Sequence, residues 1–193
     1  MLPENIIFVA VTLNLIGEIF YVRTIIRGNT RPNLVSWIMW MLAPSLGFFF
    51  EIKAGAGLAA LPVFINGFGS FIIFISAFLT KNGTWKINNY DILCGLFSLW
   101  ALVIYIFTHN LGLSIIFAIL SDFLAFIPTY IKGWEFSETE HHSTYTLAAF
   151  SNIVGLLIIK NWSFNIYSFG AYLVIANVIM VTILYRKRFL NDV

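Results

Sequence analysis

The stretch D-F-L-A-F-I-P-T-Y-I-K, from Asp122 to Lys132, places a carboxylate deep in an apolar run, a proline six residues later, and a lysine where the run ends. A proline inside a membrane helix frees a backbone carbonyl and permits a bend, which neighbouring helices tolerate better than lipid does. An aspartate near the middle of a bilayer costs about 2.5–3.5 kcal/mol on insertion scales, so its first interpretation is functional. The three features together favour a moving helix that lines a polar pathway. An aspartate paired with a neighbouring helix purely for packing is the alternative.

The composition of the whole chain indicates an integral membrane protein. Of its 193 residues, 60% are hydrophobic and 10% are charged, and the mean hydropathy is +0.87. Soluble domains carry about 25% charged residues. The formal net charge of +2 is too small and too dispersed to favour a nucleic-acid partner, and the single cysteine, Cys94, excludes an intrachain disulfide. We expect a location in the cytoplasmic (plasma) membrane of a prokaryote.

Runs of about 20 apolar residues are needed to cross a bilayer, and the sequence predicts seven of them. They lie near residues 5–24, 33–51, 57–79, 89–108, 111–132, 144–160 and 164–186. The second run is interrupted by Pro44, from which we expect a kink. The first run lacks the pattern of a cleaved signal peptide, so we expect it to be a retained helix.

Lysine and arginine are distributed unevenly over the connections between these runs. Nine lie on one side of the predicted spans and two on the other. The nine are Arg23, Arg27, Arg31, Lys81, Lys86, Lys132, Arg186, Lys187 and Arg188, and the two are Lys53 and Lys160. Because cytoplasmic loops carry an excess of basic residues, the sequence predicts an external N-terminus and a cytoplasmic C-terminus.

The chain contains a weak internal repeat. Y-V-R-T-I-I-R-G-N-T-R from Tyr21 matches Y-I-K-G-W-E-F-S-E-T-E from Tyr130, and an offset of 108 residues aligns Trp37 with Tyr145. Spans one to three therefore match spans five to seven, and the fourth span connects them. This pattern predicts an all-α membrane protein with two parallel three-helix bundles joined by a linker helix, in a 3+1+3 order. The first bundle would comprise residues 1–80, the linker region residues 81–110, and the second bundle residues 111–193.

The repeat also pairs the polar residues expected near the middle of the bilayer. Asn14 corresponds to Asp122, and Asn66 corresponds, with a small gap, to Asn177. Taken singly, each asparagine is explained by a helix–helix hydrogen bond of about 0.6–2 kcal/mol. Taken as two related pairs at one depth, the four side chains predict a shared substrate-binding site between the bundles.

The run I-P-T-Y-I-K and the Ser137-Glu138 turn after it resemble the motif of the PQ-loop superfamily, in which a Pro-Gln pair ends the first helix of a bundle. In the first repeat, I-R-G-N-T-R-P-N-L-V-S-W resembles the turn and the start of the second helix, with Ser36 at the family's serine position. The whole chain resembles the seven-helix PQ-loop and SWEET carriers in architecture. It departs from them where Thr129 replaces the glutamine and where Ile19-Phe20 stands in place of the first Pro-Gln pair.

The resemblance implies roles for several residues. Pro128 would be a hinge for alternating access, and Asn66 and Asn177 would contact substrate from the third helix of each bundle. Asp122 stands near the acid of proton-coupled members, so its protonation could drive transport. Pro44 is a second candidate hinge because it lies inside its own predicted span.

Other residues leave two interpretations open. Glu18 is either the snorkelling ion-pair partner of Arg23 or a second proton-coupling site. Trp37 and Trp40 share one helix face and, with Tyr145, could close the pathway or stack on a ring-shaped solute. Interfacial anchoring or core packing explains the two tryptophans equally well.

We expect a small secondary transporter that moves a small polar solute by alternating access. The alternative is a membrane receptor or accessory subunit of the same fold that binds a ligand without translocating it. We do not expect an enzyme, because no phosphate loop, nucleophile elbow or zinc helix is visible. His141 and His142 beside two acids could bind metal, but a solvated loop cluster explains them better, and neither metal nor cofactor is expected. The expected partners are the solute and the bilayer, and the protein could be a monomer or a homo-oligomer.

Overall fold

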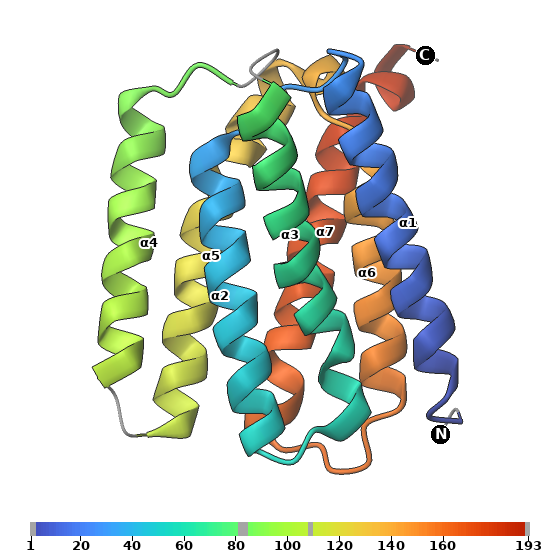
Figure 1. The fold of residues 1–193 in the computed structure, drawn as a ribbon, viewed down its shortest axis with the longest axis vertical. Coiled ribbons are helices and arrows are strands. Elements are labelled where there is room, and N and C mark those ends of the chain that lie inside the picture. Colours follow the sequence, from blue (N-terminus) through green and yellow to red (C-terminus); the bar gives the residue numbers. More distant parts are fainter. Residues whose placement is uncertain (1–2, 81–84, 108–109, 192–193) are drawn as a thin grey trace.

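The protein is helical over almost all of residues 3–80, 85–107 and 110–191, which the computed structural model describes (Figure 1). The α-helices in this part are α1 (Ile6–Ile26), α2 (Leu34–Lys53), α3 (Leu61–Thr80), α4 (Asn89–Phe107), α5 (Leu111–Glu135), α6 (His142–Leu157) and α7 (Phe164–Asn191). Two short 3-10 helices, η1 (Gly57–Ala60) and η2 (Ser137–Thr139), precede α3 and α6. Successive helices run in opposite directions, so the two chain termini lie at opposite ends of the molecule (Figure 1).

Five helices in the described part of the chain are long and apolar enough to cross a membrane, namely α1, α2, α3 with η1, α5 and α7. Their outward faces carry large apolar side chains such as Phe78 and Ile175, which are 64% and 60% exposed. Such extensive exposed apolar surface is unfavourable in water and is matched by lipid. The fold is therefore that of an all-α integral membrane protein.

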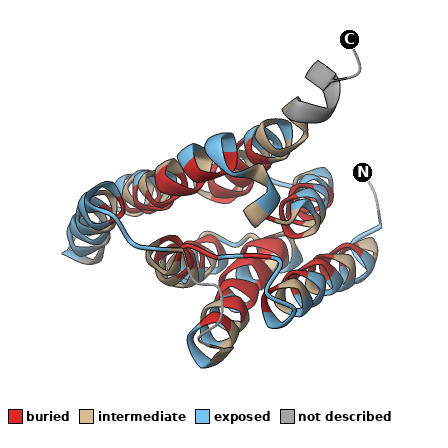
Figure 2. Ribbon diagram, turned by 90° about the horizontal axis from the view of Figure 1, so that it is seen from above, coloured by how far each residue is buried: buried red, intermediate tan, exposed pale blue. Residues whose placement is uncertain are grey.

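The helices pack in two sets of neighbours. α3 packs against both α1 and α2, and α7 packs against both α5 and α6. The sets meet where α1 packs on α6 and where α2 packs on α5. α4 packs chiefly on α5, with a smaller contact to α2, and stands at the edge of the molecule with much of its surface exposed (Figure 2).

Glycine ends the first two helices in the same way. At the end of α1, Gly28 has a φ of 74°, its N–H donates to the Ile25 carbonyl at 2.9 Å, and the Asn29 N–H donates to the Thr24 carbonyl at 3.0 Å. Gly55, with a φ of 88°, repeats the arrangement at the end of α2. This left-handed cap suits glycine, which lacks the Cβ that makes positive φ costly, and it lets the chain reverse within a few residues.

Neither of the two candidate hinge prolines ends its helix. α2 continues through Pro44 to Lys53, and α5 continues through Pro128 to Glu135. The fifth predicted span stopped at Lys132, but the helix runs three residues further because the Lys132 side chain is buried and paired instead of facing solvent at the helix end.

Candidate functional site

A small cavity lies among six of the seven helices. Its volume is about 30 Å³, which is enough for a water molecule. Its wall consists of Glu18 of α1, Trp37, Trp40 and Pro44 of α2, Asn66 and Ser70 of α3, Asp122 and Phe126 of α5, Thr144, Tyr145 and Ala148 of α6, and Leu173 and Asn177 of α7. α4 contributes none of these lining residues, so the cavity belongs to the two sets of packed helices.

Most of the predicted substrate-binding residues meet at this cavity. Five of the six line its wall: Asn66, Asp122, Asn177, Trp37 and Tyr145. The sixth, Asn14, is fully buried and is connected to the wall because its Nδ2 donates to Asn66 Oδ1 at 3.4 Å. Asn177 Nδ2 donates to the Leu173 carbonyl at 2.8 Å, one turn earlier in α7.

Asp122 is fully buried in the cavity wall. Its Oδ2 accepts a hydrogen bond from the Tyr172 hydroxyl at 2.8 Å, whereas its Oδ1 has no partner among the described residues. Sequence reasoning missed Tyr172, because a tyrosine in an apolar helix gives no sign of which helix it faces. The bond to Tyr172 of α7 agrees with the packing interpretation of Asp122, and the free Oδ1 agrees with the binding interpretation.

Glu18 also lies in the cavity wall and is 3% exposed. Thr144 lies in the same wall, and Glu18 Oε2 has no partner in the described part of the chain. The snorkelling interpretation is therefore wrong, because the carboxylate turns into the bundle instead of toward Arg23 at the helix end. Gly69 makes room for it, because a Cβ at that position would lie 2.6 Å from Glu18 Cγ.

Aromatic rings form one side of the cavity, which we call the aromatic wall: Trp37, Trp40, Phe126 and Tyr145. The rings of Trp37 and Trp40 are 5.0 Å apart and nearly perpendicular, and Trp40 lies 4.3 Å from Phe126. Trp37 and Trp40 are only 2% and 4% exposed, so they do not anchor α2 at the lipid–water boundary. Trp40 Nε1 has no hydrogen-bond partner among the described residues.

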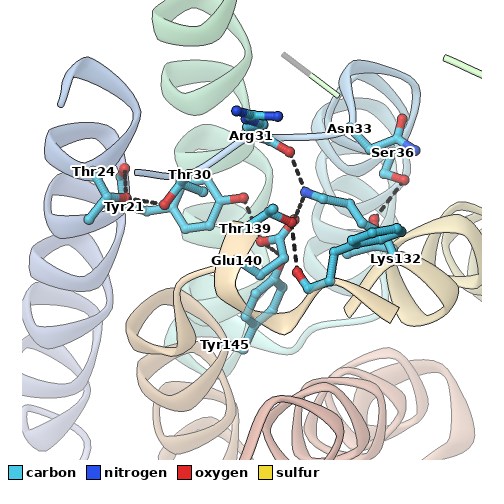
Figure 3. Close-up of polar contacts among 12 residues, drawn as sticks. Tyr21, Thr24, Thr30, Arg31, Asn33, Ser36, Lys132, Thr139, Glu140 and Tyr145 are labelled. Atoms are coloured by element: carbon cyan, nitrogen blue, oxygen red, sulfur yellow. Dashed lines mark hydrogen bonds and ion pairs between the residues drawn. The ribbon is translucent and has the colours of Figure 1, made fainter. Parts of the chain in front are cut away.

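A second polar group, the basic-end cluster, lies where α5 and α6 meet the α1–α2 connection (Figure 3). Lys132 Nζ lies 2.5 Å from Glu140 Oε1, and the two side chains are 1% and 0% exposed. The Tyr21 and Tyr145 hydroxyls donate to Glu140 Oε2 at 2.7 and 3.0 Å, and Lys132 also donates to the Arg31 carbonyl. Tyr145 thus belongs to both sites, because its ring lines the cavity and its hydroxyl binds Glu140.

The expectation that Glu140 lies in a solvated loop is wrong, whereas Lys132 does lie in the last turn of α5, close to the expected end of its span. Glu140 is 8% exposed and holds the buried lysine. A signal for Lys132 existed, because it continues the helix face formed by the buried residues Ala118, Asp122, Ala125 and Thr129. No comparable pattern marks Glu140, whose position depends on the turn that contains η2.

His141 is the N-cap of α6 and not a free loop side chain. Its Nδ1 accepts the Ser143 N–H at 3.3 Å. Asn33, 108 residues earlier, caps α2 in the same way by accepting the Val35 N–H at 3.1 Å. Partial burial lowers the pKa of His141 from its ordinary 6.5, although the charge of Glu140 acts in the opposite direction.

Hydroxyl groups join the two sets of helices. Ser36 Oγ donates to the Ala125 carbonyl at 2.7 Å and accepts from Thr129 Oγ1 at 2.9 Å, linking α2 to α5. At the second contact between the two sets of helices, Ser143 Oγ donates to the Gly17 carbonyl at 3.4 Å and links α6 to α1. Ala125 and Gly17 are 108 residues apart, which is the offset found between the two halves of the sequence.

The two hinge candidates are not brought together. Pro44 lines the cavity, whereas Pro128 faces a separate pocket of about 520 Å³ between α4 and α5, which Trp85 and Asp91 also line. Asp91 is held there by Asn33, whose Nδ2 donates to Asp91 Oδ1 at 2.8 Å. Pro128 is therefore positioned to affect the packing of α5 on α4 and not the cavity wall directly.

The chain matches no family model, and comparisons with curated proteins and with solved structures find no match either. The features of the molecule that bear on function are therefore the cavity, the buried polar groups in its wall and the helices that carry them.

Proposed function

We propose that the protein is a small secondary transporter that moves a small polar solute by alternating access between two three-helix bundles. α1–α3 would form the first bundle, α5–α7 the second, and α4 the linker. The packing supports this 3+1+3 division, because the third helix of each triplet contacts the other two and the triplets meet along two equivalent helix pairs. Both triplets line the cavity, as expected for a site at the interface of two repeats.

The observation that carries the proposal is the set of unpartnered polar atoms at the cavity. Asn66 Nδ2, Asp122 Oδ1, Glu18 Oε2 and Trp40 Nε1 are buried, and each lacks a hydrogen-bond partner among the described residues. An unmade hydrogen bond on a buried polar group costs about 1–3 kcal/mol. Donors and acceptors kept together at this cost are best explained by a polar guest that binds to them.

We further propose that all seven helices cross the plasma membrane of a prokaryote with the N-terminus outside. Arg27, Arg31, Lys86 and Arg186 belong to the end that carries the α1–α2 and α3–α4 connections, and Lys53 and Lys160 belong to the other (Figure 1). Lys81 and the side chains of Lys187 and Arg188 lie outside the described residues. The excess of basic residues at one end supports a cytoplasmic location for that end. α6, with 16 residues, would span about 24 Å, so it requires flanking residues to reach both interfaces.

The proposal agrees with the resemblance to PQ-loop and SWEET carriers. Pro128 and Pro44 remain the candidate hinges, and Thr129, in place of the family's glutamine, bonds to Ser36 across the bundle interface. Asp122 is the proposed proton-coupling group, with Glu18 as a second candidate. If Asp122 couples transport to protons, Asp122→Asn transport in liposomes will be insensitive to a pH gradient to which the wild type responds.

A counterflow assay with purified protein in liposomes tests the transport proposal. Sugars, nucleosides, amino acids, vitamins and amines would first be screened for thermal stabilisation, and the hits would then be assayed for flux. We expect Asn177→Ala to abolish both signals. Asn152→Ala is the matched control, because Asn152 makes the same bond to a carbonyl one turn earlier, at 2.8 Å, but does not line the cavity.

The outcomes separate the alternatives. Stabilisation that depends on Asn177, without flux for any solute, would favour a receptor or accessory subunit. Equal loss of stabilisation and flux in Asn177→Ala and Asn152→Ala would mean that the cavity is not the binding site. Absence of both stabilisation and flux across the panel would overturn the proposal.

A further inference from the structure

The cavity is acidic. Glu18 and Asp122 contribute two carboxylates to its wall, and none of the lining side chains is lysine, arginine or histidine. The buried lysine nearest in the sequence to Asp122 is Lys132, and its charge is already matched by Glu140. The charge of the cavity wall is therefore negative or, when protons neutralise the acids, zero, and it is never positive.

Each of the two acids has a buried oxygen left for a guest. Asp122 Oδ1 and Glu18 Oε2 have no partner in the described part of the chain, while the Tyr172 hydroxyl holds Asp122 Oδ2. The Glu18 side chain lies in the wall beside Gly69, where a Cβ would leave it no room. When the acids are ionised, a neutral guest would leave their buried charges uncompensated, whereas a cation would compensate them and bind with charge-assisted hydrogen bonds.

The aromatic wall supplies a second kind of attraction for a cation. The indole rings of Trp37 and Trp40 are arranged edge to face at 5.0 Å, and Trp40 also packs against Phe126. Tryptophan faces bind ammonium groups through the ring quadrupole, by about 2 kcal/mol or more when water is excluded. Acids on one part of a buried wall and indoles on another form the combination that recognises organic ammonium ions.

We propose that the transported solute is an organic cation, an amine or quaternary ammonium ion without a carboxylate of its own. This inference rests on the proposed transport function and names the solute class for the same site. An amino acid or other zwitterion is disfavoured, because its carboxylate would approach Glu18 and Asp122 without a basic side chain to bind it. A sugar could stack on the indoles but would leave the two acids without a counter-charge.

The size of the cavity sets a condition on binding. About 30 Å³ accommodates a group of the size of a water molecule or a bare ammonium head, so a solute with a larger body requires a more open conformation. The body of the solute would then lie along the aromatic wall while its nitrogen faces the acids.

Three solutes that differ in charge and share one shape test the proposal. Choline is the cation, 3,3-dimethyl-1-butanol is its neutral isostere, and betaine carries the same head group with a carboxylate. Butylamine and 1-butanol form a second pair for a primary amine. Affinity would be measured by calorimetry or thermal shift on the full-length protein in detergent, and flux by counterflow in liposomes. We expect at least one amine to bind at least about tenfold more tightly than its neutral counterpart, the effect of one charged hydrogen bond.

Isosteric variants assign that affinity to the cavity. Glu18→Gln and Asp122→Asn should each weaken amine binding about tenfold or more, while the affinity for a neutral alcohol remains unchanged. Glu51→Gln is the matched control, because Glu51 is 1% exposed, has an unpartnered Oε1, and does not line the cavity. Retained elution profile and melting temperature in detergent confirm that each variant is folded.

Amines that bind no more tightly than their neutral isosteres, or equal losses in Glu51→Gln and the two cavity variants, would overturn the cation assignment. Counterflow of a sugar or nucleoside without any response to amines would overturn it too, and would leave the transport proposal standing. Amine binding that depends on Glu18 and Asp122, without flux, would instead support the cation site and contradict transport.

Discussion

Replacing Lys132 by methionine tests whether the basic-end cluster holds the bundles together. The variant keeps most of the length of the side chain but removes its charge, and it leaves Glu140 buried with only the Tyr21 and Tyr145 hydroxyls as partners. The ion pair joins α5 to the start of α6, and Lys132 reaches the Arg31 carbonyl in the α1–α2 connection as well. Loss of the ion pair should therefore destabilise the packing between the two sets of helices.

The burial of the Lys132–Glu140 pair determines how much the free energy of unfolding should fall in the variant. Both side chains are at most 1% exposed, and removing one partner of a pair buried to this extent costs about 3–5 kcal/mol, because the remaining charge is uncompensated. Glu140→Gln should cost a similar amount for the same reason. The double variant should cost clearly less than the sum of the two, because it leaves no buried charge behind.

The assay is equilibrium unfolding in mixed micelles with increasing sodium dodecyl sulfate, followed by tryptophan fluorescence. Lys160→Met is the control, because Lys160 pairs with Glu4 at 73% and 46% exposure, and exposed pairs contribute about 0–1 kcal/mol. A cost for Lys132→Met no greater than that for Lys160→Met would refute the reasoning. So would a double variant whose cost equals the sum of the single ones.

Two further predictions concern single positions. Gly69→Ala places a Cβ about 2.6 Å from Glu18 Cγ, so we expect it to displace the Glu18 carboxylate and weaken amine binding about as much as Glu18→Gln does; calorimetry with unchanged affinity would contradict this. For His141, the folded-state pKa lies below the ordinary 6.5, so the cap to Ser143 stabilises the protein above that pH and is lost as the pH falls below it. In His141→Asn the cap persists at low pH, because asparagine does not become protonated. On acidification, thermal melts should show that the wild type loses about 0.5–2 kcal/mol of unfolding free energy, whereas the variant does not. Identical pH dependence of the two melts would rule the cap out as the cause.

The helices could be predicted from the sequence because apolar run length is a local property. All seven predicted runs form helices, and most boundaries differ by one to three residues from those expected. Two boundaries differ by more: α3 begins at Leu61 after η1 instead of at 57, and α7 continues to Asn191 beyond the expected end at 186. A helix can continue past its apolar run, because charged residues such as those at the end of α7 do not end a helix.

The partners of the buried charges could not be predicted, because they come from other parts of the chain. The repeat indicated that Asn66, Asp122 and Asn177 lie at one depth, and the structure brings them to one cavity. The repeat contained no information on Tyr172, which lies 50 residues further along the chain and donates a hydrogen bond to Asp122. Likewise, Lys132 counts among the basic residues that predict the orientation, but its environment is decided by Glu140, eight residues further on.

The basic-end cluster and the cavity differ in whether their buried charged groups have hydrogen-bond partners. In the basic-end cluster, both Glu140 oxygens and the Lys132 ammonium group have partners, so the cluster needs nothing further. At the cavity, the carboxylates of Glu18 and Asp122 each keep a free oxygen although they are buried as deeply. A buried carboxylate oxygen without a partner costs stability, and two of the three such oxygens in the described residues face one cavity, whereas the third, on Glu51, does not. The free oxygens at the cavity, and not the ion pair, are therefore where binding of a solute should be sought first.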